Sequence, residues 1–237
     1  MKLALCLSSI LALAACSSGP TYVGSTDAAT PTDDAGNTTT TDAAAEATTG
    51  DTGTTNPLCA NGYPAGPYGV GVGDVLDPTF SWQGYAANAT TVSTLTMSDL
   101  FDCDGSKGID ALIFDDSAGW CAACEDQAHD EASLMSQYDQ LGIKANTLLI
   151  MDAAENAATT ATALAWRTTY GLTDVGIYAD ANFLLEPQNQ MTIGLPLTMI
   201  VDPRTMKIAE VLEGYASTYP LQPNPTAVAI ATKNRQQ

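Results

Sequence analysis

Residues 120–124, with the sequence Trp-Cys-Ala-Ala-Cys, constrain the fold of this chain more than any other feature. Residues 111–114, shortly before them, form a continuous apolar stretch, which is typical of a strand buried on both faces. After them, apolar or small residues recur at the spacing of one buried helical face. These residues are Cys124, Ala128, Ala132, Met135 and Tyr138. The sequence therefore predicts a buried strand, a turn with the two cysteines, and an amphipathic helix.

This spacing puts Cys121 and Cys124 in the first turn of the predicted helix. Unpaired backbone amides and the positive end of the helix dipole meet there, and both favour a thiolate over a thiol. The first cysteine is expected to be the more exposed, so we predict that Cys121 attacks a substrate disulfide. Cys124, expected to be more buried, then resolves the mixed disulfide.

The remaining patterns predict an α/β fold with a mixed sheet, because strands and helices alternate first and adjacent strands follow. Further strands are predicted at residues 79–82, 91–95, 147–151, 175–178, 197–201 and 207–212. Helical segments are predicted at 98–101, from 152 to 171, at 181–185 and from 224 onward. In the second of these helices, Asp152 is the predicted N-cap, with Glu155 three residues on as a variant of the capping box.

The pattern of strand, Trp-Cys-x-x-Cys and helix resembles the thioredoxin superfamily. The resemblance includes Trp120 and extends to Gly194-Leu195-Pro196 before a predicted strand; family members hold a cis proline there against the cysteine pair. Residues 73–80 and 100–111 resemble the redoxin branch, which includes membrane-tethered periplasmic reductases and peroxiredoxins. The resemblance covers about residues 73–214. It implies a thioredoxin-like fold with a mixed central β-sheet flanked by helices and an N-terminal redoxin-type strand extension.

The resemblance also implies a role for Asp115, which lies six residues before Cys121. Thioredoxins carry a buried acid at that place, and it assists proton transfer to the resolving cysteine. Asp116 is the alternative, because strand alternation points only one of the two side chains inward. We assign the inward position to Asp115. The competing interpretation is that both carboxylates simply end the strand at the solvent edge.

The chain departs from family patterns at several positions. A peroxiredoxin places a Thr three residues before its reactive cysteine, whereas this chain has Ala118, which argues against peroxidase activity. Leu195 stands before Pro196 in place of the commoner Thr or Val. Copper chaperones of the superfamily use a wider cysteine spacing and a distant histidine. Here His129, the only histidine, lies five residues beyond Cys124, so we interpret it as an exposed helical residue.

The N-terminal residues predict export and lipid attachment. Lys2 precedes an apolar run over residues 3–15 that is too short to span a bilayer, which is typical of a secretory signal. The run ends in Leu-Ala-Ala before Cys16, which resembles the lipobox of bacterial lipoproteins. The resemblance implies acylation of Cys16, and Ser17 after it favours the outer membrane, facing the periplasm. The alternative is an ordinary signal peptide with an incidental cysteine.

Three segments follow from these patterns: a signal peptide at 1–15, a disordered acidic Thr/Ala-rich tether at 16–57, and a folded domain at 58–237. The formal net charge of −19 argues against nucleic acid as a partner. No metal or other cofactor is predicted. The expected partners are protein or small-molecule thiols and disulfides, a redox partner that recycles the pair, and the membrane through Cys16.

Cys59 and Cys103 remain once the signal, the anchor and the active pair are set aside. In an oxidising compartment they suit a structural disulfide. The alternative is that either accepts a disulfide from Cys121 and Cys124 during turnover. The leading functional hypothesis is a cell-envelope thiol-disulfide oxidoreductase. The alternatives are a binding or sensing protein that keeps the dithiol as a staple, a copper chaperone that uses His129, and a peroxidase.

Overall fold

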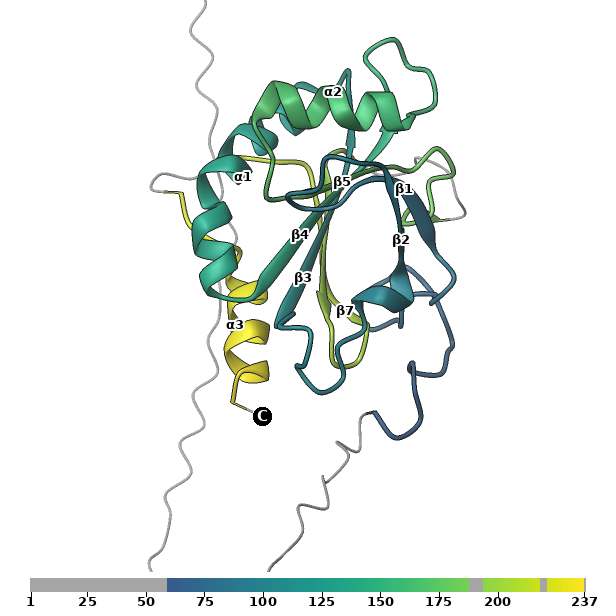
Figure 1. Cartoon of the computed structure of the whole chain (residues 1–237), viewed down its shortest axis with the longest axis vertical. Coiled ribbons are helices and arrows are strands. Elements are labelled where there is room, and N and C mark those ends of the chain that lie inside the picture. Colours follow the sequence, from purple (N-terminus) through teal and green to yellow (C-terminus); the bar gives the residue numbers. More distant parts are fainter. Residues whose placement is uncertain (1–58, 188–193, 218–220, 237) are drawn as a thin grey trace, which may run out of the picture. The chain divides into compact units, whose positions relative to one another are not determined.

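A computed structural model describes residues 59–187, 194–217 and 221–236 of the chain (Figure 1). The predicted signal peptide, the lipid anchor at Cys16, the tether and residue 58 lie outside the described residues. Within the described part, a single mixed sheet has the strand order β2-β1-β5-β4-β3-β6-β7. This arrangement agrees with the α/β fold and mixed sheet that the sequence predicts.

The elements follow one another along the chain as strands that alternate with helices and then as two adjacent strands. The strands are β1 (Ser81–Tyr85), β2 (Ser93–Thr96), β3 (Ala111–Ala118), β4 (Ile143–Met151), β5 (Gly176–Ala179), β6 (Leu197–Asp202) and β7 (Lys207–Glu213). The helices are η1 (Met97–Leu100), α1 (Ala122–Gln140), α2 (Thr160–Tyr170) and α3 (Pro225–Asn234). Among the described residues, none of these helices has the length and apolar character that crossing a membrane requires.

Strand β3 lies inside the sheet, between β4 and β6. It pairs in parallel with β4, and β4 pairs in parallel with β5. Helix α1 connects β3 to β4, and α2 connects β4 to β5, because parallel neighbours need a crossover connection. On the other side, β6 is antiparallel to both β3 and β7. The hairpin β1–β2 extends the sheet beyond β5. It is the strand extension that the sequence predicts ahead of the cysteine pair.

The two faces of β3 belong to two separate hydrophobic clusters. Ala111 and Ile113 pack in the cluster that contains buried residues of α1, α2 and α3. Leu112 and Phe114 pack in the other cluster, with residues of the segment before β3, such as Trp82. All eight residues of β3 are buried, which agrees with the prediction of a strand covered on both faces. Because side chains alternate between the two faces along β3, Asp115 lies on the same face as Ile113, and Asp116 on the same face as Phe114.

The helices begin and end at the residues that cap them. The Sγ atom of Cys121 caps α1 by accepting a hydrogen bond from the amide of Cys124. Thr159 caps α2, and Gly171 ends it with a φ of +70°, the left-handed conformation that glycine adopts without a steric penalty. Asn224 caps α3 and Pro225 is its first residue, as the sequence predicts.

The prediction that Asp152 caps the second long helix is wrong. The carboxylate of Asp152 instead accepts hydrogen bonds from the amides of Ala154 and Asn156, which closes a tight turn. Glu155 lies in that turn with a φ of +63°, and a bridge joins Met151 to Ala157. The helix therefore begins only at Thr160. Residues 181–185 form turns rather than a helical turn.

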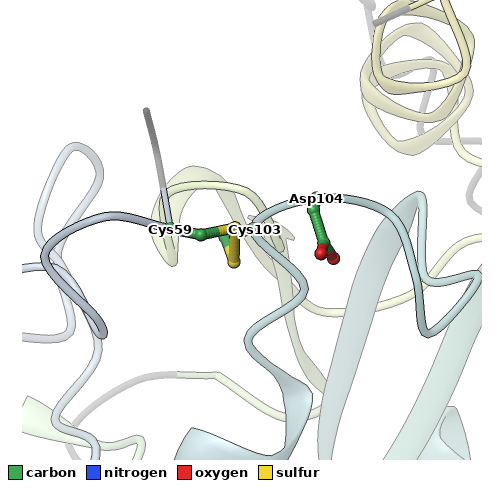
Figure 2. A group of neighbouring side chains, drawn as sticks. All are labelled: Cys59, Cys103 and Asp104. Atoms are coloured by element: carbon green, nitrogen blue, oxygen red, sulfur yellow. A yellow bond between two sulfur atoms is a disulfide. The ribbon is translucent and has the colours of Figure 1, made fainter. Parts of the chain in front are cut away.

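The N-terminal segment of the described part is covalently tied to the loop before β3. Cys59 and Cys103 form a disulfide with an S–S distance of 2.04 Å, which confirms the predicted pairing. Figure 2 shows the bonded pair with the side chain of Asp104 beside it. The two sulfur atoms and a carboxylate oxygen of Asp104 all lie within 4.8 Å of one another. Because both sulfur atoms are used in the disulfide, they offer no thiolate to a metal ion in this oxidised state.

Candidate active site

The two cysteines of the Trp-Cys-Ala-Ala-Cys motif lie at the N-terminus of α1 and form a disulfide. Cys121 is 7% exposed and Cys124 is 1% exposed, so the first cysteine is the more accessible, as predicted. The amides of Cys124 and Glu125 both donate to the carbonyl oxygen of Cys121. The sulfur of Cys121 also accepts a hydrogen bond from the amide of Cys124 at 3.2 Å, and it lies at the positive end of the helix dipole, where negative charge is stabilised.

The turn that carries the cysteines is packed against the end of β4. The amide of Gly119 donates to the carbonyl oxygen of Met151 at 3.0 Å. A Cβ atom at Gly119 would lie 2.6 Å from the amide nitrogen of Ala153, which is closer than such contacts allow. Glycine is therefore required at this position for the turn to approach the segment after β4. Trp120, the next residue, is 40% exposed.

Pro196 lies at the same edge of the sheet as the cysteine turn. The antiparallel register puts Leu197 opposite Asp116, so Pro196, just before β6, lies level with the end of β3. The Leu195–Pro196 peptide bond is cis, which agrees with the expected geometry. Leu195 packs against the hydrophobic cluster that contains both cysteines. The carbonyl oxygen of Pro196 accepts a hydrogen bond from the amide of Gly214.

Asp115 is the strand carboxylate on the face of β3 that the helices cover. It is 4% exposed, and its Oδ1 accepts hydrogen bonds from the side chains of Gln127 on α1 and Thr198 on β6. Burial raises the pKa of Asp115 to about 6, although the two hydrogen bonds oppose that rise. A carboxyl with such a pKa accepts and returns a proton near neutral pH.

Asp116 points to the opposite face of the sheet and is completely buried. The alternative in which both carboxylates end the strand at the solvent edge is therefore wrong. Neither oxygen of Asp116 has a hydrogen-bond partner within the part of the chain that the structure describes. Burial raises its pKa well above the usual range, and the carboxylates of Asp180 and Glu186 raise it further. Burial therefore favours its uncharged form.

Glu131 is a buried acid that the sequence analysis missed. The predicted helical face includes Ala132, but Ala132 is exposed, and Glu131 and Leu134 are buried in its place. Glu131 is 7% exposed, and burial, followed by the charge of Asp115, raises its pKa well above the usual range. No sequence signal identified it, because a glutamate on an amphipathic helix is normally on the solvent face.

His129 does not lie with the cysteines in any metal-binding group. Within the described ranges, the only cluster with metal-ligand chemistry is the one that contains Cys59, Cys103 and Asp104. His129 is exposed and packs edge-on against Tyr170 of α2, with ring centroids 4.9 Å apart. It therefore contributes to the contact between α1 and α2.

The mixed sheet flanked by helices, the cysteine pair at the start of α1 and the cis proline before β6 agree with the arrangement that the resemblance to the thioredoxin superfamily predicts. No protein-family model matches the sequence, and a comparison with curated proteins finds no significant match. A thiol:disulfide interchange protein of the thioredoxin family from Chlorobium tepidum has 16% identity over 59% of this chain and 87% of its own, with a TM-score of 0.41. AhpC from Enterococcus faecalis has 14% identity over 70% of this chain and 92% of its own, with a TM-score of 0.46. Reduced 2-Cys peroxiredoxin from Plasmodium vivax has 9% identity over 70% of this chain and 82% of its own, with a TM-score of 0.48.

Proposed function

We propose that this protein is a thiol-disulfide oxidoreductase of the cell envelope that exchanges disulfides through Cys121 and Cys124. The observation that carries the proposal is the position of the pair at the N-terminus of α1. Cys121 caps the helix and is the more accessible sulfur, while Cys124 is almost fully buried one turn further on. This asymmetry suits one attacking and one resolving thiol.

In the reducing direction, the reaction starts from the dithiol form of the pair. The Cys121 thiolate attacks one sulfur of a substrate disulfide, forms a mixed disulfide and releases the first substrate thiolate. Cys124 gives up its proton and attacks Cys121, which releases the second substrate thiolate. The pair loses two electrons to become a disulfide, and the substrate gains the same two electrons. The reverse sequence oxidises a substrate dithiol.

Asp115 is proposed as the group that accepts the proton of Cys124 and returns it in the reverse reaction. It faces the side of the sheet on which α1 packs, and its pKa of about 6 is close to that needed for proton exchange near neutral pH. Trp120 and Pro196 flank the pair at the same edge of the sheet, where a substrate chain is expected to bind.

We base the proposed cellular location on the N-terminal sequence. A signal at 1–15, acylation of Cys16 and an acidic tether at 16–57 would hold the folded domain at a membrane outside the cytoplasm, with the outer membrane favoured. An exported dithiol needs a redox partner to recycle it, and its substrates are protein or small-molecule thiols and disulfides.

The test is a single-turnover reaction of the reduced full chain with a chromogenic aromatic disulfide. The background is Cys6→Ser/Cys16→Ser/Cys59→Ser/Cys103→Ser, so that thiols are present only at Cys121 and Cys124. We expect rapid release of two equivalents of aromatic thiolate. In this background, Cys124→Ser should release one equivalent and retain a stable mixed disulfide, and Cys121→Ser should lose the rapid phase.

The same experiment can contradict the proposal. If Cys121→Ser reacts as fast as its parent, or if Cys124→Ser releases both equivalents, the assigned roles are wrong. If alkylation of the parent across pH reveals no thiol with a lowered pKa, the pair is a structural staple. The reduction potential of the pair, measured against glutathione, then decides between a reductase and an oxidase.

A further inference from the structure

A cavity of about 600 Å³ lies on the helix side of the sheet, between α1, β3, β6 and the segment after β7. Neither cysteine of the candidate active site lines it. Its polar wall includes Asp115, Gln127, Glu131 and Thr198, and Ile113 and Leu134 form part of its apolar wall. The volume lies within the range of cavities that bind small molecules.

The polar wall has more hydrogen-bond acceptors than donors. The Nε2 of Gln127 donates to both Asp115, at 2.7 Å, and Thr198, at 2.9 Å. The hydroxyl of Thr198 also donates to Asp115. The Oε1 of Gln127 and the Oε1 of Glu131 are buried and accept no hydrogen bond of ordinary geometry from the described residues, although the hydroxyl of Thr147 is near enough to lower the pKa of Glu131. Buried acceptors without donors are costly, and a ligand rich in N–H groups would satisfy them.

The charge of the wall points to the same kind of ligand. Asp115, Glu131 and Glu213 line the cavity, and no Lys, Arg or His is among the described residues that do so. Glu131 is 93% buried, so its carboxylate has little contact with solvent. The nearby carboxylate of Asp130 already accepts the hydroxyl of Tyr215. A cation would therefore meet carboxyl groups that ionise when it binds, with no basic side chain among the described lining residues to compete for them, in a place shielded from water.

We propose that this cavity binds a small organic cation of the alkylguanidinium or alkylammonium class. The charged head lies at Glu131 and the Oε1 of Gln127, and the alkyl chain packs on Leu134 and Ile113. Binding requires neither cysteine, although the cavity shares Asp115 with the proposed proton transfer. A planar guanidinium suits the site best, since it offers several donors to separate acceptors.

Binding should release protons in the weakly acidic range. In the empty cavity, burial keeps the pKa of Glu131 well above its usual range and that of Asp115 near 6. A bound cation lowers both values, because it favours the ionised carboxylates. The other titratable groups that face the cavity are Glu213, Tyr138 and Tyr215. The two tyrosine hydroxyls have raised pKa values and stay protonated throughout this range.

The test is isothermal titration calorimetry on the oxidised full chain with butylguanidinium and its neutral isostere butylurea. We expect saturable binding of one butylguanidinium per chain, and binding of butylurea weaker by at least about tenfold. Glu131→Gln should weaken butylguanidinium binding by about 30-fold or more. Asp126→Asn removes a charge from the exposed face of the same helix and should leave binding within about twofold of the parent.

Several results would overturn the proposal. They are no binding of butylguanidinium, equal binding of butylurea, or an unchanged affinity in Glu131→Gln. Titrations of the unmodified chain in buffers of different ionisation heat give a second measurement, which does not depend on the folding of any variant. We expect proton release at pH 6; binding without it would place the cation away from the buried carboxyls. The roles of Cys121 and Cys124 are judged separately, by the single-turnover assay run without the cation.

Discussion

Thr198 lies directly opposite Asp115 in the antiparallel pair of β3 and β6, and its hydroxyl donates a hydrogen bond to the Oδ1 of Asp115. The two residues are 83 positions apart in the sequence. Gln127 donates to the same oxygen from α1. Two donors from two elements thus fix this carboxyl beneath the helix that carries the cysteines, and they counter the effect of burial on its pKa.

Thr198→Val should raise the pKa of Asp115 above its value of about 6. The substitution keeps the shape of the side chain and removes a hydrogen bond that favours the ionised carboxyl. If Asp115 accepts the proton of Cys124, the pH profile of the single-turnover rate should move upward by about one unit. Thr168→Val, on the exposed face of α2, is the matched control and should leave the profile in place. An unmoved profile in Thr198→Val would separate Asp115 from the proton transfer.

Asp115→Asn should slow the resolving step and stabilise the fold. General acid–base groups contribute on the order of 100-fold, so we expect a loss of about that size. In the folded state the pKa is raised from 3.8 to about 6. The free energy of unfolding therefore falls as the pH rises from 3.8 to about 6, and above that pH it has lost the whole contribution of this shift. Asp115→Asn removes this loss and should gain up to about 3 kcal/mol above pH 6, measured by urea unfolding at pH 4 and pH 7.

Local patterns predicted the elements of this fold better than they predicted the site. Strand β3, the cysteine turn and α1 follow from apolar periodicity around a Cys-x-x-Cys, because each pattern is contained within a few residues. The turn at Asp152 was mistaken for a helix start, since the carboxylate of an Asp serves a tight turn as well as an N-cap. The helix begins eight residues later, at Thr160.

The polar wall of the cavity could not be predicted from the sequence. Gln127 and Glu131 look like solvent-facing residues of α1, and Ala132 looks like a core residue. Their orientation is decided by where α1 lies on the sheet, which depends on tertiary packing and not on helical periodicity alone. The family resemblance implied an inward Asp115, and the register of β3 confirms its orientation, but its partners come from β6 and α1.

Asp116→Asn should stabilise the protein without affecting thiol exchange. Burial raises the pKa of Asp116 well above 3.8, so the folded state holds its proton more tightly than the unfolded state does. Stability is therefore lost as pH rises above 3.8 towards the raised value, and the variant should show a flatter profile of unfolding free energy against pH. Because Asp116 faces away from α1, the single-turnover rate should match that of the parent. A slower reaction would indicate that the two carboxyls exchange roles.

Gly119→Ala should destabilise the cysteine turn. The added Cβ would lie 2.6 Å from the amide nitrogen of Ala153 and 2.8 Å from the carbonyl carbon of Asp152, and neither backbone atom can move away easily. We expect a loss of about 1–3 kcal/mol in unfolding free energy and a slower attack by Cys121. Gly194→Ala is the control for stability, since its Cβ would meet its nearest neighbour at an ordinary 3.6 Å. Equal effects of the two substitutions would contradict the packing argument.

Replacing both Cys59 and Cys103 by Ser should destabilise the fold and leave the candidate active site intact. The disulfide closes a loop with a sequence separation of 44 residues. The loss of chain entropy in the unfolded state for a loop of that length corresponds to about 4 kcal/mol at most, which urea unfolding of the double variant would measure. In a Cys6→Ser/Cys16→Ser background, the rapid phase of the single-turnover reaction with an aromatic disulfide should keep its rate, and the double variant should release two equivalents of thiolate from Cys121 and Cys124. If the pair instead relays electrons to Cys121 and Cys124, repeated turnover with a dithiol reductant should fall sharply in the double variant while stability changes little. A structural role lowers the unfolding free energy and a redox role lowers the repeated turnover, so one purified variant decides between the two.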